Sequence, residues 1–548
     1  MPAVPSLTTR ARSAAFVART LVSAGVLAPE RPDRLLAAGH ALLRFGLTPA
    51  AGYTAAAARR PDDLALIDDS GTLTFREVHE RSSAIAHALA DDGVDEGDGV
   101  AIMARNHRGW VEAVVACSKL GADALFLNTS FSGPQLADVV RREKARALIY
   151  DEEFKDVLAE AGKRRKRYVA WHEPEGRRTD PTLDELVERA DRSPVVAPAA
   201  EGKAIILTSG TTGTPKGASR AMPKSLQPIA ALLDRIPLHA RERTMIAAPL
   251  FHAWGYANWL LGLGLNSTVV LKRRFDPEAT LSLTARHECT ALVVVPVMLQ
   301  RILALDDEVL RRYDLAHLRA VPVSGSALPG ALSNRWMDLF GDNLYNLYGS
   351  TEVAWASIAT PADLRAAPGT AGRIPQGTIV RLYDDEDRPI DEPDRVGRIF
   401  VANEVQMEGY TGGGGKAVLD GLMSSGDVGH FDAEGRLFID GRDDDMIVSG
   451  GENVFPSEVE VLLQGHAAVE EAAVVGVEDA DFGQRLRAFV VVRRGHELSE
   501  REVKDHVKAN LAGYKTPRDV VFVDELPRNA TGKVLKRELR EDPSGAGS

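Results

Sequence analysis

Short runs of Val, Ile and Leu alternate with amphipathic helical segments from about Asp62 to Ala320. Such apolar runs are typical of strands that are buried on both faces. Strand, helix and strand in repeated order predict a largely parallel sheet with helices on its faces, and hence an α/β fold. The expected strands include Val100–Met103, Ala124–Leu127, Ala147–Tyr150, Ile205–Thr208, Val269–Leu271 and Leu292–Val295, and the expected helices include Trp110–Leu120 and Pro134–Glu143.

The pattern changes after Phe438 to a compact set of elements. Strands near Ala472–Val477 and Ala488–Val492, with helices near Pro456–Leu463 and Glu500–Leu511, predict a small α+β domain. Three successive acids resist burial and favour an exposed joint near Gly441–Asp445. We therefore expect an N-terminal extension (1–50), a large domain (51–441), a C-terminal domain (442–541) and a short tail (542–548).

Composition excludes several classes of protein. The 66 Lys and Arg residues and 78 Asp and Glu residues give a net charge of −12, so we expect no nucleic-acid partner. A hydrophobic content of 44% with 26% charged residues is that of an ordinary globular protein and excludes disorder as the main state. The two cysteines, Cys117 and Cys289, offer neither a disulfide framework nor zinc-ligand spacing, which favours a reducing compartment and a cytoplasmic location.

Two segments raise the question of membrane contact. Thr244–Leu271 has no Lys, Arg, Asp or Glu and is long enough to span a bilayer, but Pro249 and several Gly and Asn residues interrupt it. We predict strand, loop, helix and strand within the core instead. The arginine-rich N-terminus is basic and amphipathic and has no signal-peptide core. We favour a surface helix that covers the main domain; peripheral contact with an anionic membrane is the alternative.

A loop rich in glycine and hydroxyl groups follows the expected strand that ends at Thr208. Hydroxyl groups and the N–H groups of small residues can bind polyphosphate oxygens, and a lysine adds positive charge. The loop is not a Walker A motif, because Pro215 stands where that motif requires Gly. The expected phosphate contacts are Thr208, Ser209, Gly210, Thr211, Thr212, Gly213, Thr214 and Lys216.

This loop and four further blocks resemble those of the adenylate-forming enzymes, a family that includes acyl-CoA synthetases, peptide-synthetase adenylation domains and luciferases. The resemblance extends from about Ala51 to Leu539. It implies a large N-terminal adenylate-forming domain with βαβ layers and a small α+β C-terminal domain, joined by a hinge at Asp444. It also implies ATP, Mg²⁺ and coenzyme A as cofactor and co-substrates.

The block Tyr345–Glu352 carries an aromatic ring, a hydroxyl group and a carboxylate. The resemblance implies that Tyr348 stacks on adenine, that Thr351 orients a phosphate, and that Glu352 holds Mg²⁺ together with Thr208. It assigns the ribose hydroxyls to Asp427 and Arg442, a carboxylate device that dinucleotide-binding folds also use. The remaining expected nucleotide contacts are Gly325, Ser326, Ala327, Gly349 and Ser350.

Two blocks of the C-terminal domain complete the resemblance. A lysine can bring a compact positive charge to a reacting carboxylate and α-phosphate, and the resemblance gives this role to Lys533. It places the pantetheine arm of coenzyme A beside Gly450 and Gly451. The expected catalytic residues are Lys533, Glu352, Thr208 and Lys216.

The block Phe251–Gly255 matches the one that separates substrate classes in this family. Members that activate amino acids carry Asp where this chain has His252, because an ammonium group needs a partner. The apolar stretch that follows favours a medium- or long-chain fatty acid, since burial of each methylene contributes about 0.8 kcal/mol. An aromatic acid in a slot between tryptophans stays open. The expected acid-binding residues are His252, Trp254, Gly255, Tyr256, Trp259, Gly325 and Trp355.

The resemblance thus predicts an AMP-forming acid–thiol ligase that acts on a small-molecule carboxylic acid, with a fatty acid as the main expectation. The alternatives are an aryl-CoA ligase, a fatty acyl-AMP ligase that feeds a carrier protein, a luciferase-like oxygenase, and a nucleotide-binding protein without catalysis. The sequence leaves the acyl chain, the pathway and the oligomeric state open.

Overall fold

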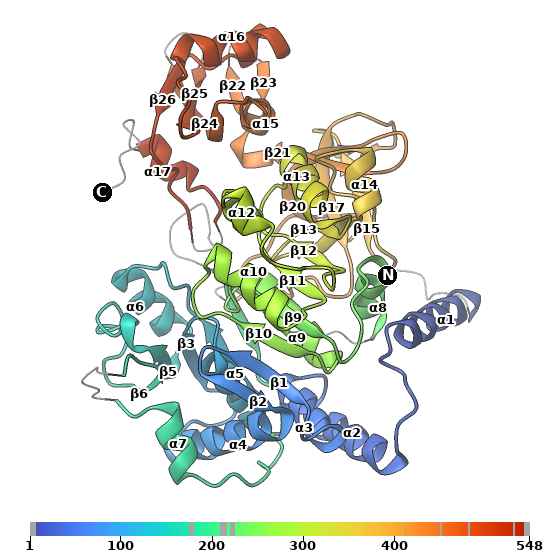
Figure 1. Ribbon diagram of the computed structural model, residues 1–548, viewed down its shortest axis with the longest axis vertical. Coiled ribbons are helices and arrows are strands. Elements are labelled where there is room, and N and C mark those ends of the chain that lie inside the picture. Colours follow the sequence, from blue (N-terminus) through green and yellow to red (C-terminus); the bar gives the residue numbers. More distant parts are fainter. Residues whose placement is uncertain are drawn as a thin grey trace.

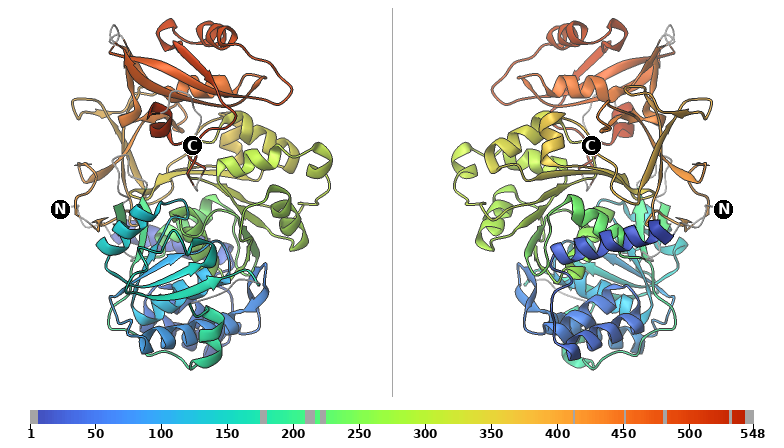
Figure 2. Two further views of the ribbon diagram at one scale, coloured as in Figure 1. Left: turned by 90° about the vertical axis from the view of Figure 1, so that its left-hand side faces the viewer. Right: turned by 90° about the vertical axis from the view of Figure 1, so that its right-hand side faces the viewer.

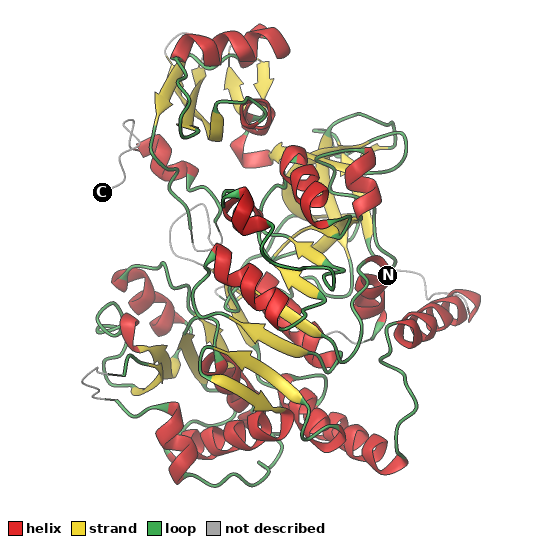
Figure 3. Ribbon diagram, in the orientation of Figure 1, coloured by secondary structure: helices red, strands yellow, loops and turns green. Residues whose placement is uncertain are grey.

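The computed structural model describes residues 7–174, 180–208, 216–219, 225–411, 413–449, 452–479, 483–529 and 532–541 (Figure 1). Within these ranges the large domain is layered, with helices over the outer faces of its sheets (Figure 3). The C-terminal domain lies above it and is joined at one side (Figure 2). The α/β class with a small α+β C-terminal domain is confirmed.

A seven-stranded sheet contains β7 and β8, the two strands that flank the expected phosphate loop. Five neighbouring strands, β7-β4-β3-β5-β6, are parallel, and β8 and β18 extend them in antiparallel fashion. Its strands are β3 (Gly99–Met103), β4 (Asp123–Phe126), β5 (Ala145–Asp151), β6 (Lys166–Trp171), β7 (Ala204–Thr208), β8 (Lys216–Ser219) and β18 (Gly409–Tyr410). The strands expected in this region are all present, because each is an apolar run buried between helices.

A second sheet has the order β11-β9-β10-β1-β2 and is parallel except for the β1–β2 hairpin. Its strands are β1 (Leu64–Asp68), β2 (Gly71–Thr74), β9 (Arg243–Ile246), β10 (Thr268–Leu271) and β11 (Ala291–Val293). The uncharged run therefore forms β9, helix α9 (Ala253–Gly264) and β10, as predicted. Among the described residues, no helix is long and apolar enough to cross a membrane.

Two smaller sheets lead from this core to the C-terminal domain. β12 (Val321–Val323), β13 (Leu344–Ser350) and β14 (Ala354–Ala359) form one, and single bridges connect the β12 segment to the β11 segment. The other is antiparallel, and its strands are β15 (Ile379–Tyr383), β16 (Pro389–Ile390), β17 (Gly397–Ala402), β19 (Val418–Leu419), β20 (Leu422–Phe431) and β21 (Leu437–Arg442).

The C-terminal domain begins after a single 3₁₀ turn at Asp443–Asp445. Its sheet packs against helices α15 and α16 and has the order β23-β22-β25-β24, with β26 parallel to β25. The elements are β22 (Ile447–Ser449), β23 (Glu452–Val454), α15 (Pro456–Gln464), β24 (Val469–Asp479), β25 (Gly483–Val492), α16 (Glu500–Asn510), β26 (Asp519–Phe522) and α17 (Lys536–Glu541). These elements confirm the four predicted from the sequence of this region.

The N-terminal extension forms two helices, α1 (Leu7–Ser23) and α2 (Pro32–Phe45). α1 packs on α8 (Gln227–Arg235) of the large domain, and α2 packs on α3 (Pro49–Arg59). This placement agrees with a surface helix that covers the main domain. α2 nevertheless leaves Leu36 and Leu43 75% and 89% exposed, so peripheral membrane contact stays a prediction.

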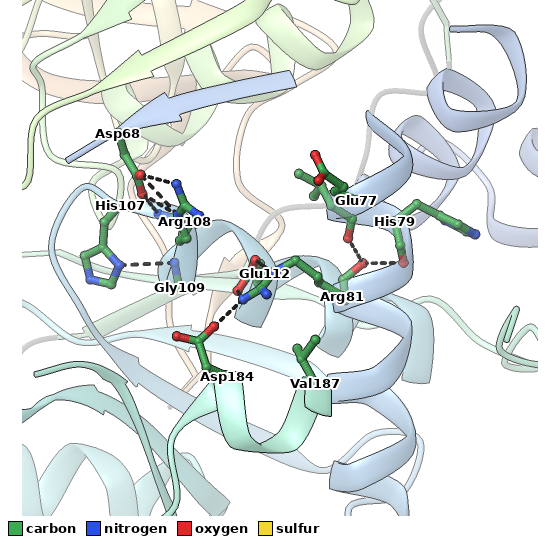
Figure 4. A network of polar contacts seen from close by, with 12 residues as sticks. Asp68, Glu77, His79, Arg81, His107, Arg108, Gly109, Glu112, Asp184 and Val187 are labelled. Carbon is green, nitrogen blue, oxygen red and sulfur yellow. Dashed lines mark hydrogen bonds and ion pairs between the residues drawn. The ribbon is translucent and has the colours of Figure 1, made fainter. Parts of the chain in front are cut away.

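Ion pairs connect helices of the large domain, and one of them includes the buried carboxylate of Glu112 (Figure 4). Arg81 lies 2.5 Å from Glu112 and 2.5 Å from Asp184, and thereby joins three helices. Glu112 is almost fully buried, and this burial raises its pKa although the Arg81 charge opposes the shift. The helices concerned are α4 (Phe75–Asp91), α5 (Arg108–Leu120) and α7 (Leu183–Arg189). The remaining helices are α6 (Gly133–Arg142), α10 (Pro277–Arg286), α11 (Pro296–Leu303), α12 (Asp307–Leu310), α13 (Gly330–Phe340) and α14 (Pro361–Ala366).

Candidate active site

A cleft of about 2440 Å³ separates the large domain from the C-terminal domain. Residues of both domains line it, from the turn after β13, from β20 and β21, and from the loop that precedes α17. Among the sequence-predicted residues, those that line it are His252, Trp254, Gly325, Ser326, Ala327, Tyr348, Gly349, Ser350, Thr351, Glu352, Trp355, Asp427, Arg442 and Lys533.

The turn from β13 to β14 presents the block Tyr348–Glu352 to this cleft. Gly349 is required by packing, because a Cβ atom there would overlap the backbone of Ala354 on the paired strand. The hydroxyl oxygen of Ser350 accepts the N–H groups of Glu352, at 3.2 Å, and Val353, at 3.3 Å. Ser350 therefore shapes the turn that aims Glu352.

Asp427 is the centre of a buried polar group. It accepts the hydroxyl of Tyr348 at 2.6 Å, and its other oxygen lies 3.3 Å from Arg442. Asp427 and Arg442 face each other across the β20–β21 pair. Burial raises the pKa of Asp427, while the Tyr348 hydrogen bond and the charges of Arg442, Lys533 and Lys416 oppose that rise. Burial beside Asp427 also raises the pKa of Tyr348 well above its usual value.

Glu352 offers a hard carboxylate ligand in the cleft. The hydroxyl of Tyr410 donates a hydrogen bond to it at 3.0 Å, which fixes one oxygen. No cluster of three or more His, Cys, Asp or Glu side chains that could hold a metal occurs among the described residues. A single carboxylate fits Mg²⁺, which takes few protein ligands and completes its shell with water and phosphate oxygens. Glu352 is thus the side chain that would hold this ion.

Lys533 reaches the cleft from the C-terminal domain. Its backbone N–H donates to the Asn529 side chain at 2.9 Å, which closes a tight loop. Gly532 in that loop has φ +78°, and a Cβ atom there would overlap Val297 of α11. Gln300, one turn further along α11, donates to the carbonyl of Glu470 at 3.4 Å. The lysine loop is therefore docked against the large domain.

Sequence reasoning missed two residues of this site. Tyr410 lies on the short strand β18, where nothing in the sequence marks it as a partner of Glu352. Lys416 follows a glycine run, and its ammonium group lies beside Gly426 and adds positive charge near Asp427. Tyr410 and Glu352 lie far apart in sequence, and Lys416 stands in a segment that carries no recognised motif, so local reasoning did not reveal either contact.

Several expected site residues lie outside the described part of the chain. These are Ser209, Gly210, Thr211, Thr212, Gly213 and Thr214 of the phosphate loop and the pair Gly450 and Gly451. The side chains of Thr208, Lys216 and Asp444 are likewise not described. The backbone register of the antiparallel pair β7 and β8 does place Thr208 directly opposite Lys216.

The expected acid pocket is only partly formed as predicted. Trp254 lines the cleft and donates its indole N–H to the Val294 carbonyl at 3.0 Å. The structure does not bring Gly255, Tyr256 and Trp259 to the cleft. Gly255 packs on the backbone of Pro249, and the rings of Tyr256 and Trp259 face the core of the domain. The helical period of α9 explains this, because only one side of that helix can face the cleft.

His252 stands at the start of α9 and lines the pocket. Burial lowers its pKa to about 4, and its buried Nε2 atom has no hydrogen-bond partner among the described residues. The imidazole is therefore neutral at neutral pH. The pocket wall formed by α8 and α9 also contains Leu232, Ile236, Ala257, Asn258 and Leu261, and the residues described in this wall include no charged side chain.

Comparison with known proteins identifies the family. A profile described as "AMP-binding enzyme" matches residues 53–411, and one described as "AMP-binding enzyme C-terminal domain" matches residues 458–533. The chain belongs to the AMP-binding enzyme family. This AMP-binding enzyme is 34% identical to a feruloyl-CoA synthase of an Amycolatopsis species over 85% of its own length and 93% of the relative. It is 33% identical to the indoleacetate–CoA ligase of Aromatoleum aromaticum over 86% and 93% of the two chains.

Its structure resembles the o-succinylbenzoate CoA synthetase of Bacillus subtilis, solved with an acyl-adenylate intermediate. The TM-score is 0.78 and the identity 28%, with 90% of this chain and 99% of the other covered. A further relative, at 30% identity, is a fatty acid–[acyl-carrier-protein] ligase of Streptomyces coeruleorubidus, matched over 88% and 94% of the two chains. The resemblance to adenylate-forming acyl-CoA ligases is thereby confirmed, as is the use of ATP, Mg²⁺ and coenzyme A.

Proposed function

We propose that this enzyme joins a ring-bearing, largely apolar monocarboxylic acid to coenzyme A through an acyl-adenylate, with release of AMP and pyrophosphate. The observation that carries the proposal is one cleft in which the Asp427–Tyr348–Arg442 group, Glu352 and Lys533 adjoin an uncharged pocket bordered by Trp254 and Trp355. The first three elements suit ATP. The uncharged wall suits an acid that has only one ionised group.

In the first half-reaction, a carboxylate oxygen of the acid attacks the α-phosphorus of ATP, and the bond to the leaving pyrophosphate breaks. Asp427 would accept ribose hydroxyls and so fix the nucleoside. Lys533 would place its positive charge at the α-phosphate, where negative charge builds up in the transition state. Mg²⁺, held by Glu352, would neutralise phosphate charge. The docked lysine loop is the arrangement that this step requires.

In the second half-reaction, the thiol sulfur of coenzyme A attacks the acyl carbonyl carbon, the bond to AMP breaks, and the thiol loses its proton. Lys533 then occupies space that the thiol must enter. We infer that the C-terminal domain turns about the 3₁₀ segment Asp443–Asp445, with Asp444 as the hinge, and withdraws the lysine. Gly450 and Gly451 would then border the pantetheine arm.

The choice of a ring-bearing acid rests on the pocket and on the relatives. Trp254 and Trp355 both line the cleft, and offset stacking between an indole ring and an aromatic acid contributes about 0.5–1.5 kcal/mol beyond simple burial. The relatives described above are named for feruloyl, indoleacetate and succinylbenzoate substrates. They favour the aryl alternative over the fatty acid that the sequence alone suggested. A neutral His252 offers no opposite charge to an ammonium group or to a second carboxylate.

The experiment is ATP–pyrophosphate exchange against a panel of acids, followed by thioester assays with each responsive acid. The panel holds cinnamic, phenylalkanoic and indole acids, straight-chain fatty acids of several lengths, and amino acids. We expect exchange and coenzyme A thioester with the ring-bearing acids. Exchange confined to fatty acids would overturn the acid class. Exchange without thioester would instead support a carrier protein as acceptor, the activity for which one relative is named.

A further inference from the structure

Helix α1 of the N-terminal extension packs against an element that forms part of the wall of the acid pocket. It packs against α8, and the right-hand view of Figure 2 shows it, in dark blue, lying across that side of the large domain. α8 and the segment after it supply Leu232, Ile236 and Leu238 to the pocket wall. The matched family profile begins at residue 53, so α1 lies outside the part of the chain that this profile matches.

Apolar side chains connect α1 to this wall. Leu21 of α1 and Ala24, in the turn directly after this helix, are 3% and 4% exposed, and they belong to the same buried cluster as Ile236 and Leu238. Leu232 and Trp254, which line the pocket, pack on that cluster from the cleft side. The cluster therefore connects Leu21 and Ala24 to side chains that line the acid pocket.

Two polar contacts fix α1 in this position. The Ser13 hydroxyl donates to the Gln227 side chain at 3.0 Å, at the start of α8. The Ala240 N–H donates to the Ala24 carbonyl at 2.8 Å, just beyond the wall segment. α8 itself has nine residues, and its N-cap residue Leu226 provides no side-chain cap. So short a helix is held by packing and not by its own stability, and α1 supplies part of that packing.

We propose that α1 sets the depth of the acid pocket, with Leu21 and Ala24 as positioning residues that act through Ile236 and Leu238. The inference deepens the proposed function and rests on it. Leu21→Ala leaves space behind the wall, into which the wall side chains can move when a longer acid enters. Each additional methylene buried there should improve binding about fourfold. Ala24→Val adds volume at the same place and should make the pocket shallower.

The test is the rate of thioester formation with a homologous series from phenylacetate to 6-phenylhexanoate. We expect Leu21→Ala to move the optimum of kcat/KM to longer acids, through KM, while the KM for ATP stays unchanged. Ala24→Val should move the optimum to shorter acids. Val22→Ala is the matched control, because Val22 is 60% exposed on the same helix. Leu21→Met nearly keeps the side-chain volume and should therefore show the same dependence of kcat/KM on acid length as the wild type.

Opposite shifts of the kcat/KM optimum in Leu21→Ala and Ala24→Val would distinguish a change in pocket depth from a general loss of structure. A uniform fall across all acids, or a raised KM for ATP, would show that α1 only stabilises the fold and would overturn the proposal. Unchanged profiles for both Leu21→Ala and Ala24→Val in properly folded protein would overturn it as well. If only fatty acids support the reaction, the same variants are measured on the fatty-acid series. In that case the proposed class of acid is wrong, and the fatty-acid series still tests the proposed role of α1.

Discussion

Gly532 offers a selective test of the docked lysine loop. Its φ of +78° lies in the left-handed region, and a Cβ atom would overlap the Val297 side chain. In Gly532→Ala, the backbone strain costs about 1–2 kcal/mol. The overlap with Val297 adds a further energetic cost only while the lysine loop is docked on α11. Carbon atoms prefer separations of about 3.5–4.0 Å, so the loop must retreat by roughly 1 Å or more.

A displacement of about 1 Å of a group that positions reactants can cost about 100-fold in rate, equivalent to about 2.7 kcal/mol. We therefore expect Gly532→Ala to slow adenylate formation by about two orders of magnitude, as measured by pyrophosphate exchange. Conversion of supplied acyl-adenylate to thioester should stay near the wild-type rate. Gly495→Ala is the control for strain, because Gly495 has φ +83° and a methyl group added there would meet no described atom within 4 Å.

A second substitution that reduces the overlap with Val297 tests whether this overlap causes the loss of activity. Val297→Ala removes the methyl groups that the new Cβ atom would meet, so the double variant should recover most of the exchange activity lost in Gly532→Ala. The exchange rates of the wild type, Gly532→Ala, Val297→Ala and the double variant form a double-mutant cycle, which isolates the interaction between the two positions. Equal slowing of both half-reactions, or no recovery in the double variant, would refute the docking argument.

Four further predictions follow from other parts of the structure. Asp427→Asn, which loses the charged acceptor for Tyr348 and ribose, should raise the KM for ATP about tenfold in pyrophosphate exchange and leave the KM for the acid unchanged; equal changes would contradict a nucleotide role. Arg81→Met leaves the buried carboxylate of Glu112 without this ion-pair partner and should lower the free energy of unfolding by about 3–5 kcal/mol in urea titrations. Arg311→Met, at an exposed ion pair, is the control and should lower it by less than about 1 kcal/mol. Burial lowers the pKa of His252 to about 4 from its usual 6.5, so the unfolded chain binds this proton more readily and the free energy of unfolding falls as the pH drops through that interval. Urea unfolding at pH 7 and at pH 4.5 measures this fall, which should be smaller by about 2–3 kcal/mol in His252→Asn than in the wild type. Exposed leucines on α2 predict sedimentation with anionic vesicles and not with zwitterionic ones, and the double change Leu36→Glu and Leu43→Glu should abolish it; equal sedimentation of wild type and variant would contradict contact through α2.

Local patterns in the sequence were sufficient for the strands and for many of the residues that line the cleft. The run Val100–Met103 is a strand because every residue in it is apolar and buried, and that information lies within the segment itself. The block Tyr348–Glu352 likewise carries its turn within a few residues, since Gly349 permits close strand pairing and Ser350 closes the turn. Such features depend on neighbours in the chain and are therefore readable from it.

Features that depend on contacts between distant segments were decided by the tertiary structure alone. Trp259 and Trp254 lie on the same helix, and only the packing of α9 determines that one faces the core and the other the cleft. Tyr410 and Lys416 join the site through strands and loops that have no motif of their own. The wall segment at Ile236–Leu238 is backed by α1, which lies about 200 residues earlier in the chain. The sequence determined the family and the chemistry, because these reside in short blocks; the shape of the acid site arose from packing, which no short block contains.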